Sequence, residues 1–137
     1  MMRLNRWTWL AVGVGIAAHG VAGRAHHSIA GVYDRNRPAT IEGVVSEVRF
    51  VNPHPLVIVD VEDDAGRAQP WTLELDNQWE LADIGFKADT LRPGDRVVVR
   101  GSLARREPHR LYVYRLDRPA DGLRYEQVGS RPRLDPG

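Results

Sequence analysis

The stretch LVIVDVEDDAGRAQPWTLELD, residues 56–76, decides the fold. Residues 56–61 are rich in β-branched side chains, which favour a strand. Residues 62–67 contain the Asp and Gly residues of a turn, and Trp71, Leu73 and Leu75 then alternate with polar residues at the period of a strand. The stretch therefore predicts an antiparallel hairpin.

More strands flank this hairpin on both sides. Alternating residues from Ile41 to Val51 predict a preceding strand, which the motif Asn52-Pro53-His54-Pro55 ends because proline has no N–H to donate. After the hairpin, Asp76 or Asn77 is expected to cap a short helix that ends at Gly85. Two further strands are predicted over residues 96–103 and 110–116.

Five strands with one helix between the third and the fourth are the order of an OB-type barrel. We predict an all-β fold with a small α contribution, a five-stranded OB-like barrel over residues 39–116; the alternatives are an open sandwich or another small barrel. The predicted core residues are Ile41, Val45, Val59, Trp71, Leu73, Val97, Val99, Leu111 and Val113. Trp71 and Trp79 are expected to fill the core under the helix or, alternatively, to line a small-ligand pocket.

The two ends of the chain differ from this pattern. Residues 1–25 carry two early arginines, an apolar run and then small residues, which is the order of a signal peptide. The apolar run over residues 7–18 is shorter than the roughly 20 residues that a membrane helix needs. We expect an irregular leader over residues 26–38 and a tail over residues 117–137 with one added short strand near 123–128.

Export to the periplasm or the medium follows from the signal peptide, with no membrane span after processing. Cleavage after Ala25 is expected, and Ala22 offers an earlier site. Only the later cut makes His26 the first residue.

Charge and cysteine usage exclude several classes of function. Of the 19 Lys and Arg residues, three (Arg3, Arg6 and Arg24) belong to the signal peptide, which leaves 16 basic against 18 acidic residues. No nucleic-acid partner is expected from this balance. The chain has no cysteine, so disulfides and thiolate metal sites are excluded.

Four histidines of the mature chain form the best functional lead: His26, His27, His54 and His109. His54 and His109 are expected in the loops joining strands one to two and four to five, which flank the ligand face of OB folds. The free amine and imidazole of His26 can chelate a metal that His54 completes, with His109 as a candidate outer member. Nitrogen ligands without thiolates suit copper, nickel or zinc, and the order of affinities favours copper.

This hypothesis has a geometric difficulty. The first strand is ~33 Å long if straight, since each strand residue rises ~3.3 Å. A leader that enters at its start must fold back along the barrel for His26 to approach His54.

Other interpretations of the same residues remain open. The histidines can be purely structural. No Gly-x-Ser-x-Gly motif is present, and the carboxylate pairs Asp60 with Glu62 and Glu74 with Asp76 are interpreted as solvated strand faces. We therefore expect no catalytic residue and no enzyme activity.

Four ordered motifs carry a resemblance to a known family: His26-His27-Ser28, Asn52-Pro53-His54, Trp71 with Glu74, and the run from Leu91 to Asp95. Over residues 26–116 the chain resembles a family of small exported bacterial proteins classed as a domain of unknown function. The resemblance implies an OB-like β-barrel with a signal peptide and brings no established activity. The chain departs from the family at Gly85-Phe86, where Gly-Trp is expected, and His109 has no counterpart in it.

Two functions are therefore carried forward. The first is a non-enzymatic binding module for copper or another divalent metal. The second is an accessory protein with purely structural histidines, which presents the edge of its barrel to another envelope protein.

Overall fold

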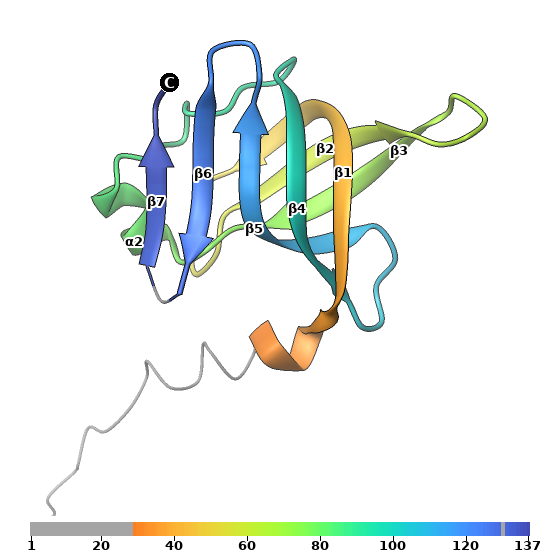
Figure 1. Cartoon of the computed structure of the whole chain (residues 1–137), viewed down its shortest axis with the longest axis horizontal. Coiled ribbons are helices and arrows are strands. Elements are labelled where there is room, and N and C mark those ends of the chain that lie inside the picture. The colour runs from red at the N-terminus through yellow and green to blue at the C-terminus, as the bar shows by residue number, and fades with distance from the viewer. Residues whose placement is uncertain (1–28, 130) are drawn as a thin grey trace, which may run out of the picture.

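The computed structural model describes residues 29–129 and 131–137, and Figure 1 shows their arrangement. Within these residues the chain forms seven strands and the short helix α2, and residues 29–32 are also helical. In chain order the elements are β1 (Tyr33–Arg49), β2 (Leu56–Glu62), β3 (Ala68–Glu74), α2 (Gln78–Asp83), β4 (Arg96–Ala104), β5 (Arg110–Arg118), β6 (Leu123–Val128) and β7 (Arg131–Asp135).

The first five strands close into a ring. Their order is β3-β2-β1-β4-β5 with antiparallel neighbours, and β3 then pairs with β5 in parallel. This last pairing joins only residues 72–74 to residues 110–112, so the ring is not quite a barrel. The predicted fold class is confirmed: the protein is mostly β, with a short helix between β3 and β4.

Strand β1 pairs with both β2 and β4, because it is long and its register shifts twice. Its first part pairs with β4 and its last part with β2, and Val44 is paired on both sides, with Arg96 and with Asp60. The register shifts between Tyr33 and Pro38 and again between Val45 and Glu47. Such bulges bend a strand and let it curve around a small core.

The core fills the ring and continues under α2. All nine predicted core residues lie in it: eight are buried, and Trp71 is partly buried against them. Their burial is the main favourable contribution to folding, since each fully buried aliphatic side chain contributes about 1.5–3 kcal/mol.

Helix α2 presents one residue inward and another outward. Asn77 caps it by accepting hydrogen bonds from the N–H groups of Trp79 and Glu80, and Leu81 is its buried residue. Trp79 is 73% exposed, so the prediction that it fills the core was wrong. The two residues are two positions apart, about 200° around a helix, and cannot both face the core.

The chain differs from the sequence prediction at both ends. Residues 29–32 are helical and β1 already begins at Tyr33, although an irregular leader was expected up to residue 38. Beyond β5, where a tail with one short strand was expected, β6 and β7 extend the sheet as an antiparallel pair. Among the helices that the structure describes, none has the length and apolar character needed to cross a bilayer.

Candidate functional site

A polar cluster gathers on the carboxylate of Glu74, the last residue of β3. Its Oε2 accepts hydrogen bonds from the hydroxyl of Tyr33 and from Nη2 of Arg110, the latter at 2.8 Å. Its Oε1 lies 3.0 Å from Nδ1 of His54. Nε of Arg110 also donates to the Tyr33 hydroxyl at 2.8 Å, which closes the cluster.

Closure of the ring assembles this cluster from four separate parts of the chain. Tyr33 pairs with Ala104 at the end of β4, and β5 begins a few residues later with Arg110. Parallel pairing places Glu74 opposite Tyr112 of β5 and, on its other side, opposite Leu56 of β2. The start of β1 therefore lies at the same end of the ring as the loop between β1 and β2.

His54 lies in that loop, as predicted, and its imidazole is nearly buried. Its side chain is 9% exposed and that of Glu74 is 13% exposed. The Nδ1 atom is buried and makes no hydrogen bond of regular angle within the described residues, so its contact with Glu74 rests on the 3.0 Å approach to Oε1. The close carboxylate fixes the orientation of the imidazole, with its Nδ1 edge toward Glu74.

The cluster holds Glu74 in its ionised form. Burial alone would raise the pKa of Glu74, but the contacts from His54, Tyr33 and Arg110 outweigh it and lower the pKa to about 2. Burial, and then the hydrogen bond to Glu74, raises the pKa of Tyr33, so its hydroxyl keeps the proton that it donates. The cluster therefore contains a permanent carboxylate beside the His54 imidazole.

His109 lies in the loop between β4 and β5, as predicted, but has other partners. Its backbone adopts a φ of 53°, and its carbonyl accepts a hydrogen bond from the N–H of Thr72 at 2.8 Å. Its ring lies 5.1 Å from the ring of Trp71, centroid to centroid. The imidazole of His109 thus covers an aromatic side chain, whereas that of His54 faces a carboxylate.

The predicted metal ligands are divided between described and undescribed residues. His26 and His27 lie outside the described residues. Within residues 29–129 and 131–137, no group of three or more His, Asp and Glu side chains is arranged to hold a metal ion. Ile29, the first described residue, packs against the small cluster of Tyr33, Ala104 and Tyr112.

The sequence analysis did not identify Tyr33 and Arg110 as site residues, and it noted Glu74 only as part of the family motif with Trp71. Tyr33 was assigned to an irregular leader, and Arg110 resembled the other arginines of an arginine-rich chain. Glu74 and Asp76 were interpreted as a solvated strand face, which is wrong, since Glu74 is nearly buried and Asp76 is 8% exposed. The alternation of residues 71–76 indicated two faces, but not that Tyr33, His54 and Arg110 gather on the second one around Glu74.

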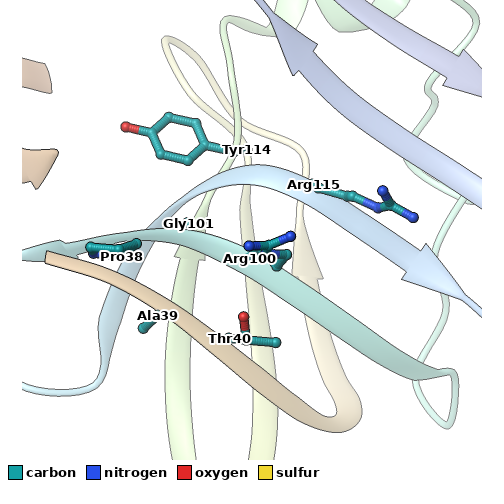
Figure 2. A pocket seen from close by; sticks show the side chains of 7 residues that line it. All are labelled: Pro38, Ala39, Thr40, Arg100, Gly101, Tyr114 and Arg115. Carbon is teal, nitrogen blue, oxygen red and sulfur yellow. The ribbon is translucent and has the colours of Figure 1, made fainter. Parts of the chain in front are cut away.

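A separate hollow lies on the outer side of the ring, across β1, β4 and β5 (Figure 2). Its volume is about 350 Å³. Seven residues line it: Pro38, Ala39, Thr40, Arg100, Gly101, Tyr114 and Arg115.

Comparison with known proteins places the chain in a family. Residues 13–110 match the family of unknown function DUF6152, a stretch that runs through β1–β4 and includes His54, Glu74 and Arg110. Strands β6 and β7 lie beyond the matched residues. No match to a curated protein was found. The predicted resemblance to a family of unknown function is confirmed to this extent: the chain belongs to the DUF6152 family.

Proposed function

We propose that this protein is an exported, non-enzymatic binding module that holds a divalent metal ion, copper first, at the end of the ring where Glu74 lies. The ligands are the amine and imidazole of His26, His27 and the Nε2 of His54. His109 is left out, because its ring is packed against Trp71. The proposal rests on one observation, the contact of His54 with Glu74.

The contact of His54 with Glu74 resembles the arrangement around histidines that bind metals. Histidines that bind metals usually have a carboxylate or carbonyl at the second ring nitrogen, which orients the ring and raises the basicity of the ligating nitrogen. In this protein Nδ1 of His54 faces Oε1 of Glu74, and Glu74 is itself held by Tyr33 and Arg110. A metal at Nε2 would thus bind an imidazole whose position is already set.

The path of the chain removes the geometric difficulty of the histidine hypothesis. The hydroxyl of Tyr33 bonds to the carboxylate that faces His54, so the start of β1 already lies at the His54 end of the ring. His27 is two residues before Ile29, a reach of at most ~7 Å along the backbone. The leader therefore does not need to follow the length of β1.

The donor set favours copper among divalent ions. Amine and imidazole nitrogens without thiolates bind Cu(II) most tightly in the usual order of affinities, and Ni(II) and Zn(II) are the next choices. The absence of cysteine excludes a thiolate ligand. We assign no catalytic step to this site.

The alternative, an accessory protein that offers a free sheet edge, has less support. Strand β3 is unpaired with β5 before residue 72, which leaves one edge open. The N–H of Thr72 points to the β5 side. Because the backbone groups of a strand alternate in direction, the backbone nitrogen of Pro70 points to the same side as that of Thr72. Proline has no N–H, so Pro70 offers no donor to a strand that would pair at this open edge. The edge of β7 likewise contains Pro132 between two arginines, which discourages pairing with another strand.

The test is calorimetric titration of mature protein with Cu(II), after intact mass has established that the chain begins at His26. We expect one ion per chain, with affinity at least about tenfold weaker in His54→Ala and in Glu74→Gln, because losing either a ligand or its carboxylate partner has effects of this size. His109→Ala serves as the matched control and should bind as the wild type does. Unchanged affinity in His54→Ala, or no stoichiometric binding, would overturn the proposal.

A further inference from the structure

The hollow on the outer side of the ring is built by an irregularity in β5. Arg100 of β4 is paired with Arg115, whereas Gly101, the next residue, is paired with Val113. Tyr114 is therefore an extra residue, a β-bulge. Val113 and Leu116 are both fully buried, so the two residues between them, Tyr114 and Arg115, lie together on the outer side. Bulges recur beside functional sites because they redirect side chains in this way.

The bulge also places two arginines opposite each other. Like charges directly opposite on neighbouring strands destabilise a sheet. Arg115 is compensated, since its Nε lies 2.7 Å from Asp117 Oδ2 and its Nη1 lies 3.4 Å from Glu126 Oε1. Arg100 is exposed and has no ion pair or side-chain hydrogen bond within the residues that the structure describes. The positive charge of Arg100 at the hollow is therefore not offset by an acidic side chain of the described residues.

The hollow has partly apolar walls, and neighbouring side chains hold Tyr114 in position. The Tyr114 hydroxyl lies 2.7 Å from Oγ of Ser102, and its ring meets the Tyr112 ring edge-on, with centroids 6.0 Å apart. Pro38 and Ala39 of β1 line the hollow as well, and Figure 2 shows Ala39 across the β4 ribbon from Tyr114. An aromatic ring and a proline beside an uncompensated guanidinium suit a ligand with an apolar body and one acidic group.

We propose that this hollow binds a small organic anion, with its carboxylate or phosphate oxygens at Arg100 and its apolar body against Tyr114 and Pro38. The site shares no residue with the polar cluster on Glu74 and does not depend on the proposed metal. The volume of about 350 Å³ admits an aromatic acid or a small phosphate ester. An oxyanion there offsets the repulsion between Arg100 and Arg115.

Two probes separate the carboxylate from the phosphate source: benzoate and phenyl phosphate are each titrated into ¹⁵N-labelled mature protein, with benzyl alcohol as the neutral analogue. We expect saturable shifts of the Thr40, Gly101 and Tyr114 amide signals with at least one of the anions. Benzyl alcohol should produce none. The tighter of the two anions identifies the acidic group that the site accepts.

The variant Arg100→Gln tests the role of the charge. We expect this variant to bind the anion about tenfold more weakly, because it loses one charge-assisted hydrogen bond. The matched control is Arg133→Gln, which changes an exposed arginine two strands from Arg115 on the same outer face, outside the hollow. This control should bind as the wild type does.

Thermal unfolding gives a second, independent measurement. Without ligand and at low salt, Arg100→Gln should unfold at a higher temperature than the wild type because the repulsion with Arg115 is gone, whereas Arg133→Gln should not. The proposal is overturned if neither anion gives saturable shifts at the hollow, or if Arg100→Gln binds the anion as tightly as the wild type.

Discussion

The hydroxyl of Tyr33 donates a hydrogen bond to the carboxylate of Glu74, 41 residues further along the chain. The same carboxylate faces His54 and accepts a hydrogen bond from Arg110. One buried acid thus joins the start of β1, the end of β3, the start of β5 and the loop before β2. It acts where β3 and β5 pair over only three positions, which is the weakest seam of the ring.

We expect Glu74→Gln to destabilise the protein by about 2 kcal/mol, because Arg110 and His54 would lose a nearly buried charged partner. Urea unfolding of metal-free protein measures the change. Glu107→Gln is the matched control, since it removes the other acid on Arg110, at 2.7 Å from Nη1, from a position that is 57% exposed. Its effect should stay within about 0.5 kcal/mol. Equal effects of the two substitutions would show that the buried carboxylate has no special part in closing the ring.

Asp117 makes part of the stability dependent on pH. Its hydrogen bond to Arg115, and secondarily that to Arg124, lower its pKa below the ordinary value of 3.8 despite partial burial. Because the folded pKa is the lower one, the carboxylate stabilises the fold at pH values above 3.8, and this contribution is lost as the pH falls below it. Glu126 is the other acid at Arg115. It is present both in the wild type and in the Asp117→Asn variant used below, so its own titration contributes to both.

The measurement is urea unfolding of the wild type and Asp117→Asn between about pH 6 and about pH 2. The wild type should be the more stable protein at the upper end, and the difference should shrink at the acidic end, where Asp117 is neutral. A difference that is independent of pH would contradict the assignment of this contribution to the Asp117 charge.

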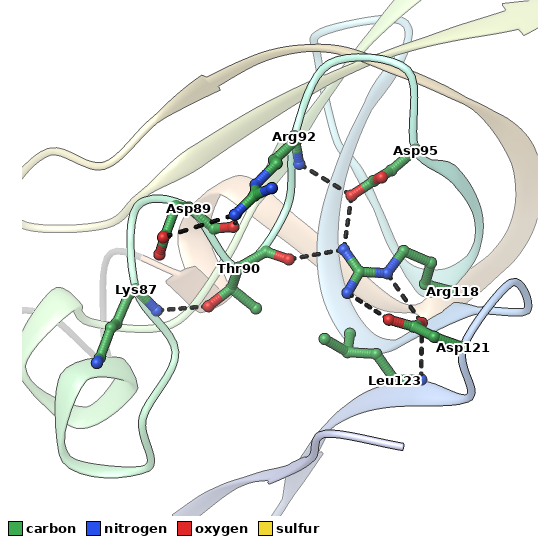
Figure 3. Close-up of polar contacts among 8 residues, drawn as sticks. All are labelled: Lys87, Asp89, Thr90, Arg92, Asp95, Arg118, Asp121 and Leu123. Atoms are coloured by element: carbon green, nitrogen blue, oxygen red, sulfur yellow. Dashed lines mark hydrogen bonds and ion pairs between the residues drawn. The ribbon is translucent and has the colours of Figure 1, made fainter.

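Arg118 is the last residue of β5, and its side chain binds the loop before β4 (Figure 3). Its Nη1 donates to the carbonyl of Thr90 and to Asp95 Oδ2, both at 2.7 Å, and its Nε and Nη2 hold Asp121. Lysine cannot reproduce this planar fork, so Arg118→Lys should cost about 1–2 kcal/mol in urea unfolding. Arg96→Lys, at an exposed pair with Glu42, is the control and should be nearly neutral. If the two changes had the same effect, the fork geometry of Arg118 would be unimportant.

The strands of the ring were predictable because each has a local strand signal, such as the alternation from Ile41 onward or the β-branched run over residues 56–61. Strand β7 was missed because Arg131-Pro132-Arg133-Leu134-Asp135 has low strand propensity and becomes a strand by pairing with β6. Trp79 was expected in the core, but the buried stripe of α2 runs through Leu81 and is too narrow to include it.

The candidate site was predictable only in part for a related reason. His54 stands out in the sequence between two prolines. Glu74 stood out only as part of the family motif with Trp71. Tyr33 and Arg110 carry no local signal, since the association of the three residues depends on the parallel pairing of β3 with β5. A strand pattern indicates which residues share a face and not which strands will pair side by side and bring their side chains together on it.

The proposed metal site is tested most directly by paramagnetic broadening in the NMR spectrum of mature protein that begins at His26. Cu(II), added below one equivalent, broadens signals of nuclei close to the ion. We predict selective loss of the His54 imidazole signals and weakening of the Tyr33 amide signal, with the Asp117 amide signal unaffected, and a markedly smaller effect on Tyr33 in His54→Ala. Broadening confined to the leader, with sharp His54 signals, would contradict the account.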